Sequence, residues 1–172
     1  MSKIEVKNKI LSSALNLRLH LRKSARTIEN MITVIQVSED HEFDQVFRIR
    51  KEVFVVEQAV PEDEEWDEFE HICKHYLAYW GEMPVGAARW RRTLSGDYKL
   101  ERFAVLLPYR GRGVGEAVLE AVLKDVPRIE NTKIYIHAQL SAKGFYAKNG
   151  FVAEGEEFDE AGIRHVKMAY VR

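Results

Sequence analysis

A turn dense in glycine and arginine is the segment of this sequence best suited to chemistry. Residues 110–115 read Arg-Gly-Arg-Gly-Val-Gly, after an apolar run at 103–107 that predicts a buried strand. Apolar residues then recur at helical spacing from Val114 to Leu123. A helix that begins here leaves backbone N–H groups unpaired at its positive end, and glycine lets a ligand approach them closely. The spacing therefore predicts a seat for phosphate, to which Arg110 and Arg112 add positive charge.

Two common phosphate loops do not fit these residues. The P-loop requires Gly-Lys-Ser/Thr at its end, where this chain has Gly115 and Glu116. A dinucleotide-binding loop that opens at Gly111 requires Gly or Ala at position 116. The pattern that fits is Arg/Gln-x-x-Gly-x-Gly/Ala, met by Arg110, Gly113 and Gly115. Here the chain resembles the GNAT superfamily of N-acetyltransferases, in which this loop holds the pyrophosphate of acetyl-CoA.

A second motif supports the resemblance. Residues 139–151 are similar to the GNAT signature Asn-x-x-Ala-x-x-Phe-Tyr-x-x-x-Gly-Phe, with Gln139 at the usual Asn position. The matching positions are Ala142, Phe145, Tyr146, Gly150 and Phe151. Ser141 predicts the start of a short helix, and Asn149 with Gly150 predicts its end. The resemblance covers residues 32 to 171.

The resemblance implies a fold and a co-substrate site. The fold class is α/β, of mixed α+β type: a GNAT-type central mixed, mostly antiparallel sheet with helices on both faces. Acetyl-CoA is the expected co-substrate, and no metal is expected. Main-chain groups of the strand before the loop are expected to bind the thioester carbonyl and pantetheine as fixed dipoles. The residues expected to bind acetyl-CoA are Phe103, Ala104, Val105, Arg110, Gly111, Arg112, Gly113, Val114, Gly115 and Gln139.

Tyr146 is the predicted acid for the departing thiolate. A phenol keeps its proton at neutral pH and can donate it to sulfur. The alternative is a packing role beside Phe145.

Glu101 is the predicted base for the amine, because some GNAT enzymes use a Glu at the corresponding place. Strand alternation puts it on the same face as Phe103 and Val105. Apolar neighbours there would raise its pKa and improve it as a base near neutrality. The alternatives are an ordinary strand carboxylate paired with Arg102 or Lys99, and water, Glu57 or His137 as the base.

Eight acidic residues stand between positions 57 and 70 with no Lys or Arg among them. In GNAT folds the region after the first helix lines the acceptor site, so a negative rim there would concentrate a cationic amine. A solvated helix face is the other interpretation. The eight residues are Glu57, Glu62, Asp63, Glu64, Glu65, Asp67, Glu68 and Glu70.

His71, Cys73 and His75 are close enough in sequence to suggest metal ligands. No second group of ligands accompanies them, so we expect no metal site. Cys73 is the single cysteine, which excludes an intrachain disulfide and suits a reducing cytoplasm.

Charge divides the chain into two parts. Residues 1–30 hold seven Lys or Arg against two Glu, although the whole chain has a formal charge of −1. This predicts a basic extension over residues 1–30, helical or loosely attached, before an acetyltransferase domain over 31–172. The extension also has the composition of a mitochondrial presequence, and it is where nucleic-acid binding would arise. We expect a cytoplasmic protein with no membrane or nucleic-acid partner, and leave a homodimer open.

The predicted order of elements is β-α-α-β-β-β-α-β-α-β-β. Strands are expected at residues 32–37, 75–80, 85–92, 99–107, 133–137, 151–156 and 165–171. The last two strands form a hairpin around Gly162. Helices are expected at 43–54 after a cap at Ser38 or Asp40, from the loop to about 125, and at 141–148.

The resemblance implies an enzyme that moves an acetyl group from acetyl-CoA to a primary amine. The acceptor would be a small, cationic molecule that attacks directly in a ternary complex. The alternative is a non-catalytic acyl-CoA-binding regulatory module. The identity of the acceptor does not follow from the sequence.

Overall fold

The computed structural model describes residues 31–171, so the predictions for residues 1–30 lie outside it. Seven strands form one sheet: β1 Ile32–Gln36, β2 Lys74–Trp80, β3 Met83–Arg92, β4 Tyr98–Val105, β5 Ile134–Gln139, β6 Phe151–Glu160 and β7 Ile163–Tyr170. The helices are α2 Asp40–Arg50, its π-helical continuation η1 Lys51–Glu57, α3 Glu62–Glu65, α4 Val114–Asp125 and α5 Lys143–Lys148. Two 3-10 turns complete the described elements: η2 Leu107–Tyr109 and η3 Leu140–Ala142.

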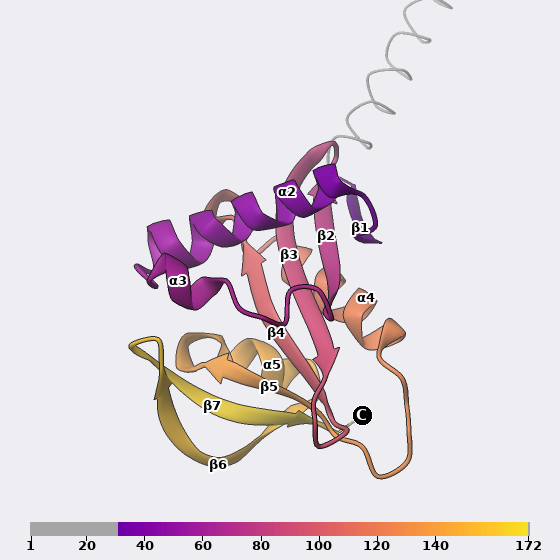
Figure 1. Cartoon of the computed structure of the whole chain (residues 1–172), viewed down its shortest axis with the longest axis vertical. Helices are drawn as coiled ribbons and strands as arrows, with labels where there is room; N and C mark the ends of the chain where they lie inside the picture. Colours follow the sequence, from indigo (N-terminus) through magenta and orange to yellow (C-terminus); the bar gives the residue numbers. More distant parts are fainter. Residues whose placement is uncertain (1–30, 172) are drawn as a thin grey trace, which may run out of the picture.

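The sheet is split near its middle. Its order is β1-β2-β3-β4-β5-β7-β6, and every neighbouring pair is antiparallel except β4 and β5. β4 and β5 pair only where Tyr98 to Leu100 face Ile134 to Ile136. Beyond this point the two strands diverge (Figure 1), so each has an edge without a partner strand. The predicted mixed, mostly antiparallel sheet is confirmed.

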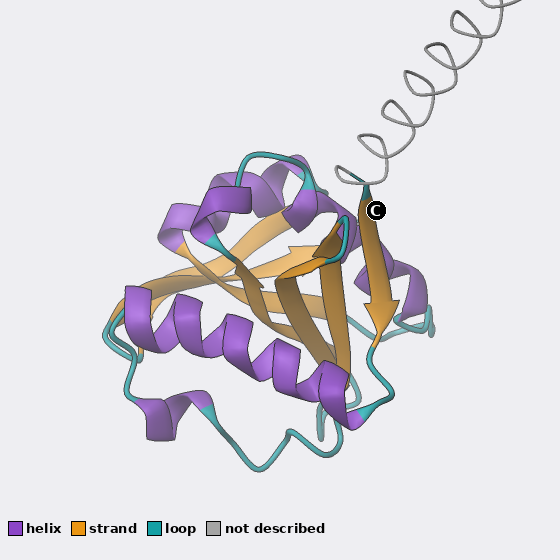
Figure 2. Ribbon diagram, turned by 90° about the horizontal axis from the view of Figure 1, so that it is seen from above, coloured by secondary structure: helices purple, strands orange, loops and turns teal. Residues whose placement is uncertain are grey.

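Helices pack on both faces of the sheet (Figure 2), as predicted. α4 covers one face through a buried stripe at helical spacing: Val114, Val118, Leu119 and Val122. α2 and η1 cover the other face through Val46, Ile49 and Val53. The two apolar layers therefore hold the split sheet between them.

β4 contains a bulge that strict alternation does not predict. Glu101 and Ala104 are three positions apart, yet the β3 residues that face them are only two positions apart. Arg102 takes the extra position with a left-handed backbone, at φ 56°. Ala104 consequently packs on the α2 side, while Phe103 and Val105 pack against the layer of α4. The prediction that Glu101 shares a face with Phe103 and Val105 is therefore wrong.

Several element boundaries differ from those predicted, and the end of β4 and the start of α2 show why. β4 ends before Leu107, which is 66% exposed and begins the turn that contains Pro108. α2 begins after Glu39, so neither predicted cap residue occupies the cap position. The carboxylate of Glu42 accepts hydrogen bonds from the backbone N–H groups of Ser38 and Glu39. Local hydrogen bonds and turn geometry set both boundaries, and the spacing of apolar residues does not predict either of these.

Candidate active site

The glycine-rich loop, residues 110–115, and the unpaired edge of β4 enclose a cavity of about 350 Å³, here called the loop cavity. The side of α5 closes it. Six residues predicted to bind acetyl-CoA line this cavity: Phe103, Ala104, Val105, Arg110, Gly111 and Gly115. The fold thus brings the strand end and the loop together, as the two motifs require.

The loop backbone has the geometry of an anion seat. Gly111 and Gly113 have φ values of 68° and 87°, which side chains rarely adopt. Gly113 immediately precedes α4, whose first N–H groups have no partner within the helix. A Cβ on Gly115 would lie 3.4 Å from the ring of Phe145, an ordinary contact distance, so this position lies directly beside α5. The side chain of Val114 is buried in the core and serves packing.

The two loop arginines contact protein groups. Arg110 donates from Nε to the Val105 carbonyl oxygen at 2.8 Å and from both Nη atoms to the Glu57 carboxylate at 2.7 and 2.6 Å. The hydrogen bond from Arg110 holds the pKa of Glu57 below its ordinary value. The Arg112 guanidinium lies 5.5 Å from the ring centre of Trp80. Both side chains therefore fix the shape of the loop around its main-chain donors.

Tyr146 lies where the loop cavity meets a second cavity of about 380 Å³. Its ring makes edge contacts with Phe103 and Phe145 at centroid distances of 6.1 and 5.0 Å. Burial raises the pKa of the phenol above its ordinary value. The hydroxyl is therefore protonated at neutral pH, as an acid for a thiolate must be.

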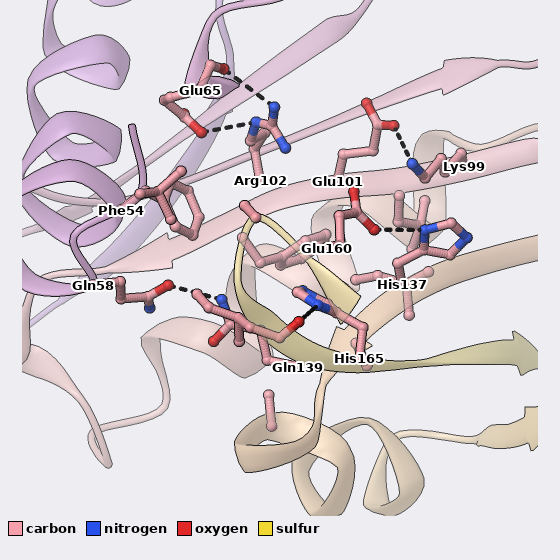
Figure 3. Close-up of a pocket in the computed structure, with 18 of the residues that line it drawn as sticks. Phe54, Gln58, Glu65, Lys99, Glu101, Arg102, His137, Gln139, Glu160 and His165 are labelled. Atoms are coloured by element: carbon pink, nitrogen blue, oxygen red, sulfur yellow. Dashed lines mark hydrogen bonds and ion pairs between the residues drawn. The ribbon is translucent and has the colours of Figure 1, made fainter. Parts of the chain in front are cut away.

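The second cavity opens between the diverging strands (Figure 3), and the β6–β7 turn forms one of its walls, so we call it the hairpin cavity. Gln139 lines it and donates from Nε2 to Oε1 of Gln58 at 2.7 Å. The side chain of this predicted acetyl-CoA residue thus lies in the hairpin cavity. The charged and titratable residues around the hairpin cavity are Glu64, Glu65, Lys99, Glu101, Arg102, His137, Tyr146, Glu160 and His165.

Glu101 is surrounded by cations. Its carboxylate lies 3.0 Å from Lys99 Nζ, 2.9 Å from Arg89 Nη2 and 3.4 Å from Arg91 Nη2. Burial raises the pKa of Glu101, but the nearby charges of Lys99, Arg89 and Arg91 outweigh burial and lower it. The predicted rise in its pKa is therefore wrong. A carboxylate with a lowered pKa and three cationic neighbours is a weak base for an ammonium group.

The acidic segment, residues 57–70, meets basic side chains that come from elsewhere in the chain. Arg50 and Arg89 are each 1% exposed and lie among its carboxylates. Arg50 contacts Glu65 at 2.6 Å and Glu70 at 2.7 Å, and Arg89 contacts Glu70 at 2.7 Å. The segment is therefore not the unopposed negative rim that was predicted. Its ion-paired carboxylates are Glu57, Glu62, Glu65, Asp67 and Glu70.

Glu160 and His165 line the hairpin cavity and were not singled out from the sequence. His137, weighed there as a base, places Nδ1 2.9 Å from Oε2 of Glu160. This hydrogen bond is the main cause that lowers the pKa of Glu160 to about 2. His165 places Nδ1 2.7 Å from the Ile163 carbonyl oxygen. Both residues flank Gly162, so the predicted hairpin was the sequence signal that could have located them.

His75, one of the residues considered as a metal ligand, is buried, and its Nε2 lies 3.0 Å from the Glu70 carbonyl oxygen. Within residues 31–171, no group of three or more His, Cys, Asp or Glu side chains is arranged to hold a metal ion. No helix in that same part of the chain is long and apolar enough to cross a membrane.

A split sheet, a glycine-rich loop at a helix N-terminus and a buried tyrosine between two cavities agree with the N-acyltransferase class that the sequence resembles. A model of the GNAT acetyltransferase domain matches residues 35–172, and the chain belongs to this family. It is therefore an acyltransferase, and its fold is one that binds acyl-CoA.

Relatives and solved structures agree with this membership. The chain is 42% identical over 139 residues to YjcF of Bacillus subtilis, described as an uncharacterized N-acetyltransferase, covering 80% of this chain and 98% of the relative. It is similar to the crystal structure of an acyl-CoA N-acyltransferase from Pseudomonas aeruginosa, with a TM-score of 0.67, 25% identity and coverage of 82% and 99%. A Bacillus subtilis acetyltransferase in complex with CoA shares the fold, with a TM-score of 0.61, 16% identity and coverage of 81% and 98%.

Proposed function

We propose that the protein transfers the acetyl group of acetyl-CoA to the primary amine of a small acceptor by direct attack in a ternary complex. The observation that carries the proposal is the junction of the two cavities. Phe103, Ala142 and Tyr146 line both of them. A thioester held in the loop cavity would therefore meet an amine held in the hairpin cavity beside a protonated phenol.

The loop cavity supplies the groups that acetyl-CoA requires. The N–H groups at Gly113 and the first turn of α4 would hold the pyrophosphate. The unpaired β4 edge from Phe103 to Val105 would bind pantetheine and polarise the thioester carbonyl with fixed backbone dipoles. The positive φ of Gly111 and Gly113 supports this assignment, because a diphosphate must approach the main chain closely.

In the proposed reaction the amine nitrogen attacks the thioester carbonyl carbon. The N–C bond forms, the C–S bond breaks, and the electron pair leaves on sulfur. Tyr146 gives its proton to the thiolate, since its buried hydroxyl keeps that proton until the charge develops. Glu101 is held by Lys99 and Arg89, so its role in this proposal is to neutralise these cations.

We propose that the acceptor is cationic, and this proposal rests on one carboxylate, Glu160, and not on the acidic segment. Glu160 stands at the hairpin cavity with a side chain that is 42% exposed, and its ion-pair partner in the described structure is His137, not Arg or Lys. Its lowered pKa keeps it negative at neutral pH. A mouth carboxylate of this kind would favour an ammonium group over an anionic acceptor.

The test is release of CoA thiol from acetyl-CoA in the presence of an amine library, with product masses. Tyr146→Phe should lower kcat by about 10²-fold while acetyl-CoA affinity is unchanged. Tyr135→Phe is the matched control, because Tyr135 lies on β5 and lines neither cavity. Acetyl-CoA binding with no acetylated product from any amine would favour the non-catalytic binding module instead.

A further inference from the structure

His165 has one ring nitrogen fixed by the backbone and the other available. A carbonyl oxygen only accepts, so the 2.7 Å contact to Ile163 means that Nδ1 carries the hydrogen. The neutral ring then presents its lone pair at Nε2. Across the described residues no hydrogen-bond partner reaches Nε2, while the residue as a whole is 8% exposed and lines the hairpin cavity (Figure 3). A fixed tautomer with a free acceptor nitrogen is the arrangement of a general base.

The position of His165 in the sheet places it toward the junction of the cavities. It faces Gln139 across the β5–β7 ladder. Gln139 is followed directly by η3, which contains Ala142, one of the residues common to both cavities. The Phe158 ring stacks on the imidazole at a centroid distance of 5.9 Å and an interplanar angle of 22°. Packing and the sheet therefore hold the ring in one orientation.

His137, the other imidazole of the hairpin cavity, has a different partner. Its Nδ1 is hydrogen-bonded to the carboxylate of Glu160, and its side chain is 29% exposed. A carboxylate also only accepts, so Nδ1 of His137 carries the hydrogen too. The two rings differ in their place on the strand pair: His165 faces Gln139 beside the junction of the cavities, whereas His137 faces Lys167. His165 bonds to a neutral carbonyl and is more deeply buried. His165 is therefore the better placed acceptor of a proton.

We propose that His165 Nε2 removes the first proton from the ammonium group of the acceptor, an inference that rests on the function proposed above. The neutral nitrogen then attacks the thioester, and Tyr146 protonates the leaving sulfur. The second amine proton restores the Tyr146 hydroxyl. The proton on His165 passes to solvent, so each turnover yields one amide, one CoA thiol and one released proton.

The charges around the hairpin cavity suit this role. Glu160 lines the same cavity as His165, so its carboxylate would offset the positive charge that forms on the imidazole during the reaction. Lys99 and Arg102 oppose that effect, but Glu101 and Glu65 pair with them. The titratable and charged groups that face His165 across the cavity are Glu64, Glu65, Lys99, Glu101, Arg102, His137, Tyr146 and Glu160.

The experiment compares two small acceptors, ethylamine and O-methylhydroxylamine, which differ by one CH₂ replaced by oxygen. Ethylamine is an ammonium ion at neutral pH and must lose a proton before attack, whereas O-methylhydroxylamine is already neutral. His165→Asn keeps an N–H donor for Ile163 and removes the base. It should lower kcat/KM for ethylamine by about 10²-fold at neutral pH, with a steady recovery as pH rises. For O-methylhydroxylamine the change should stay within about threefold.

His41→Asn is the matched control, because His41 is exposed and lines neither cavity, and both acceptors should react as with the parent. His165→Gln provides a second variant if the first does not fold. Equal losses with both acceptors would show that His165 only supports the structure. A selective loss of ethylamine turnover in His137→Asn would assign the base to His137 and overturn the proposal. A parent enzyme that acetylates neither probe nor any amine of the library contradicts the proposed function itself.

Discussion

The glycine-rich loop and the acidic segment are both dense in charged or special residues, yet they present different atoms to their surroundings. The loop presents main-chain N–H groups at Gly113 and the start of α4. The acidic segment presents side-chain carboxylates, most of which are neutralised by cations from other elements. The two regions meet at one contact, the bidentate pair of Arg110 and Glu57.

The difference lies in what fixes each charge. The donors of the loop are set by neighbouring residues, because positive φ and a helix start follow from the local sequence. Whether a carboxylate keeps an unpaired negative charge depends on which cationic side chains lie beside it in the folded protein. Arg50 and Arg89 are 15 and 22 positions from the acidic partners they bind, Glu65 and Asp67. Local sequence therefore predicts the main-chain donors of the loop, whereas a local count of charge is misleading for the acidic segment and for Arg110, which pairs with Glu57.

The largest expected effect tests the buried ion pairs of the acidic segment. Arg50→Met leaves Glu65 and Glu70 short of a cation in a buried site, and should lower the free energy of unfolding by about 3–5 kcal/mol. Lys51→Met is the matched control. Lys51 follows Arg50 directly and makes an ion pair with Glu62 in which both side chains are about half exposed. Its effect should stay below about 1 kcal/mol. Urea unfolding measures both, and equal losses would mean that burial does not set the strength of these pairs.

The same variant has a pH signature. Burial raises the pKa of Glu65 more than Arg50 and Arg102 lower it. A carboxyl pKa that is raised in the folded state means that protonation of Glu65 favours folding. The free-energy cost of burying its negative charge therefore decreases as pH falls. The destabilisation by Arg50→Met should therefore shrink between about pH 7 and pH 5. A loss that grows on acidification would contradict the assigned direction.

The next effect tests the loop. Gly113→Val puts a side chain at φ 87° where the main chain is expected to meet the pyrophosphate, and should weaken acetyl-CoA binding by about 10²-fold from a micromolar Kd. Gly96→Val is the control, since Gly96 has φ 92° in a turn away from both cavities. Both variants should lose similar stability through strain, about 1–3 kcal/mol. Titration calorimetry on folded protein decides, and unchanged affinity in Gly113→Val would refute the phosphate seat.

The smallest effect concerns the acidic residues outside the ion pairs. Asp63→Asn with Glu68→Gln should change KM for ethylamine by less than about twofold, because both carboxylates are exposed and line neither cavity. Charges of this kind are screened within about 8 Å at physiological ionic strength. Raising the salt concentration should change KM as little. A large rise in KM in the double variant, abolished by salt, would restore the acidic segment as a guide for cationic acceptors.

Much of the fold could be read from the sequence, because its signals are local. The apolar spacing that begins at Val114 predicted α4, and the run before the loop predicted β4. The bulge at Arg102 could not be predicted, because it appears only when β4 is paired with β3. That bulge moved Glu101 to the other face of the sheet from Phe103, among cations. One inserted residue therefore changed the expected face of Glu101, and the structure pairs this carboxylate with Lys99, as the alternative interpretation had it.

The sequence by itself determined the family, the loop and the tyrosine that stands between the cavities. These are short motifs whose function depends on backbone conformation and on residues close in sequence. Only the tertiary structure decided which charges remain available. It paired the acidic segment with Arg50 and Arg89, and it brought His165 of β7 opposite Gln139 of β5. Ionic and proton-transfer chemistry depends on distances between residues far apart in the chain, and these distances exist only once the sheet is built.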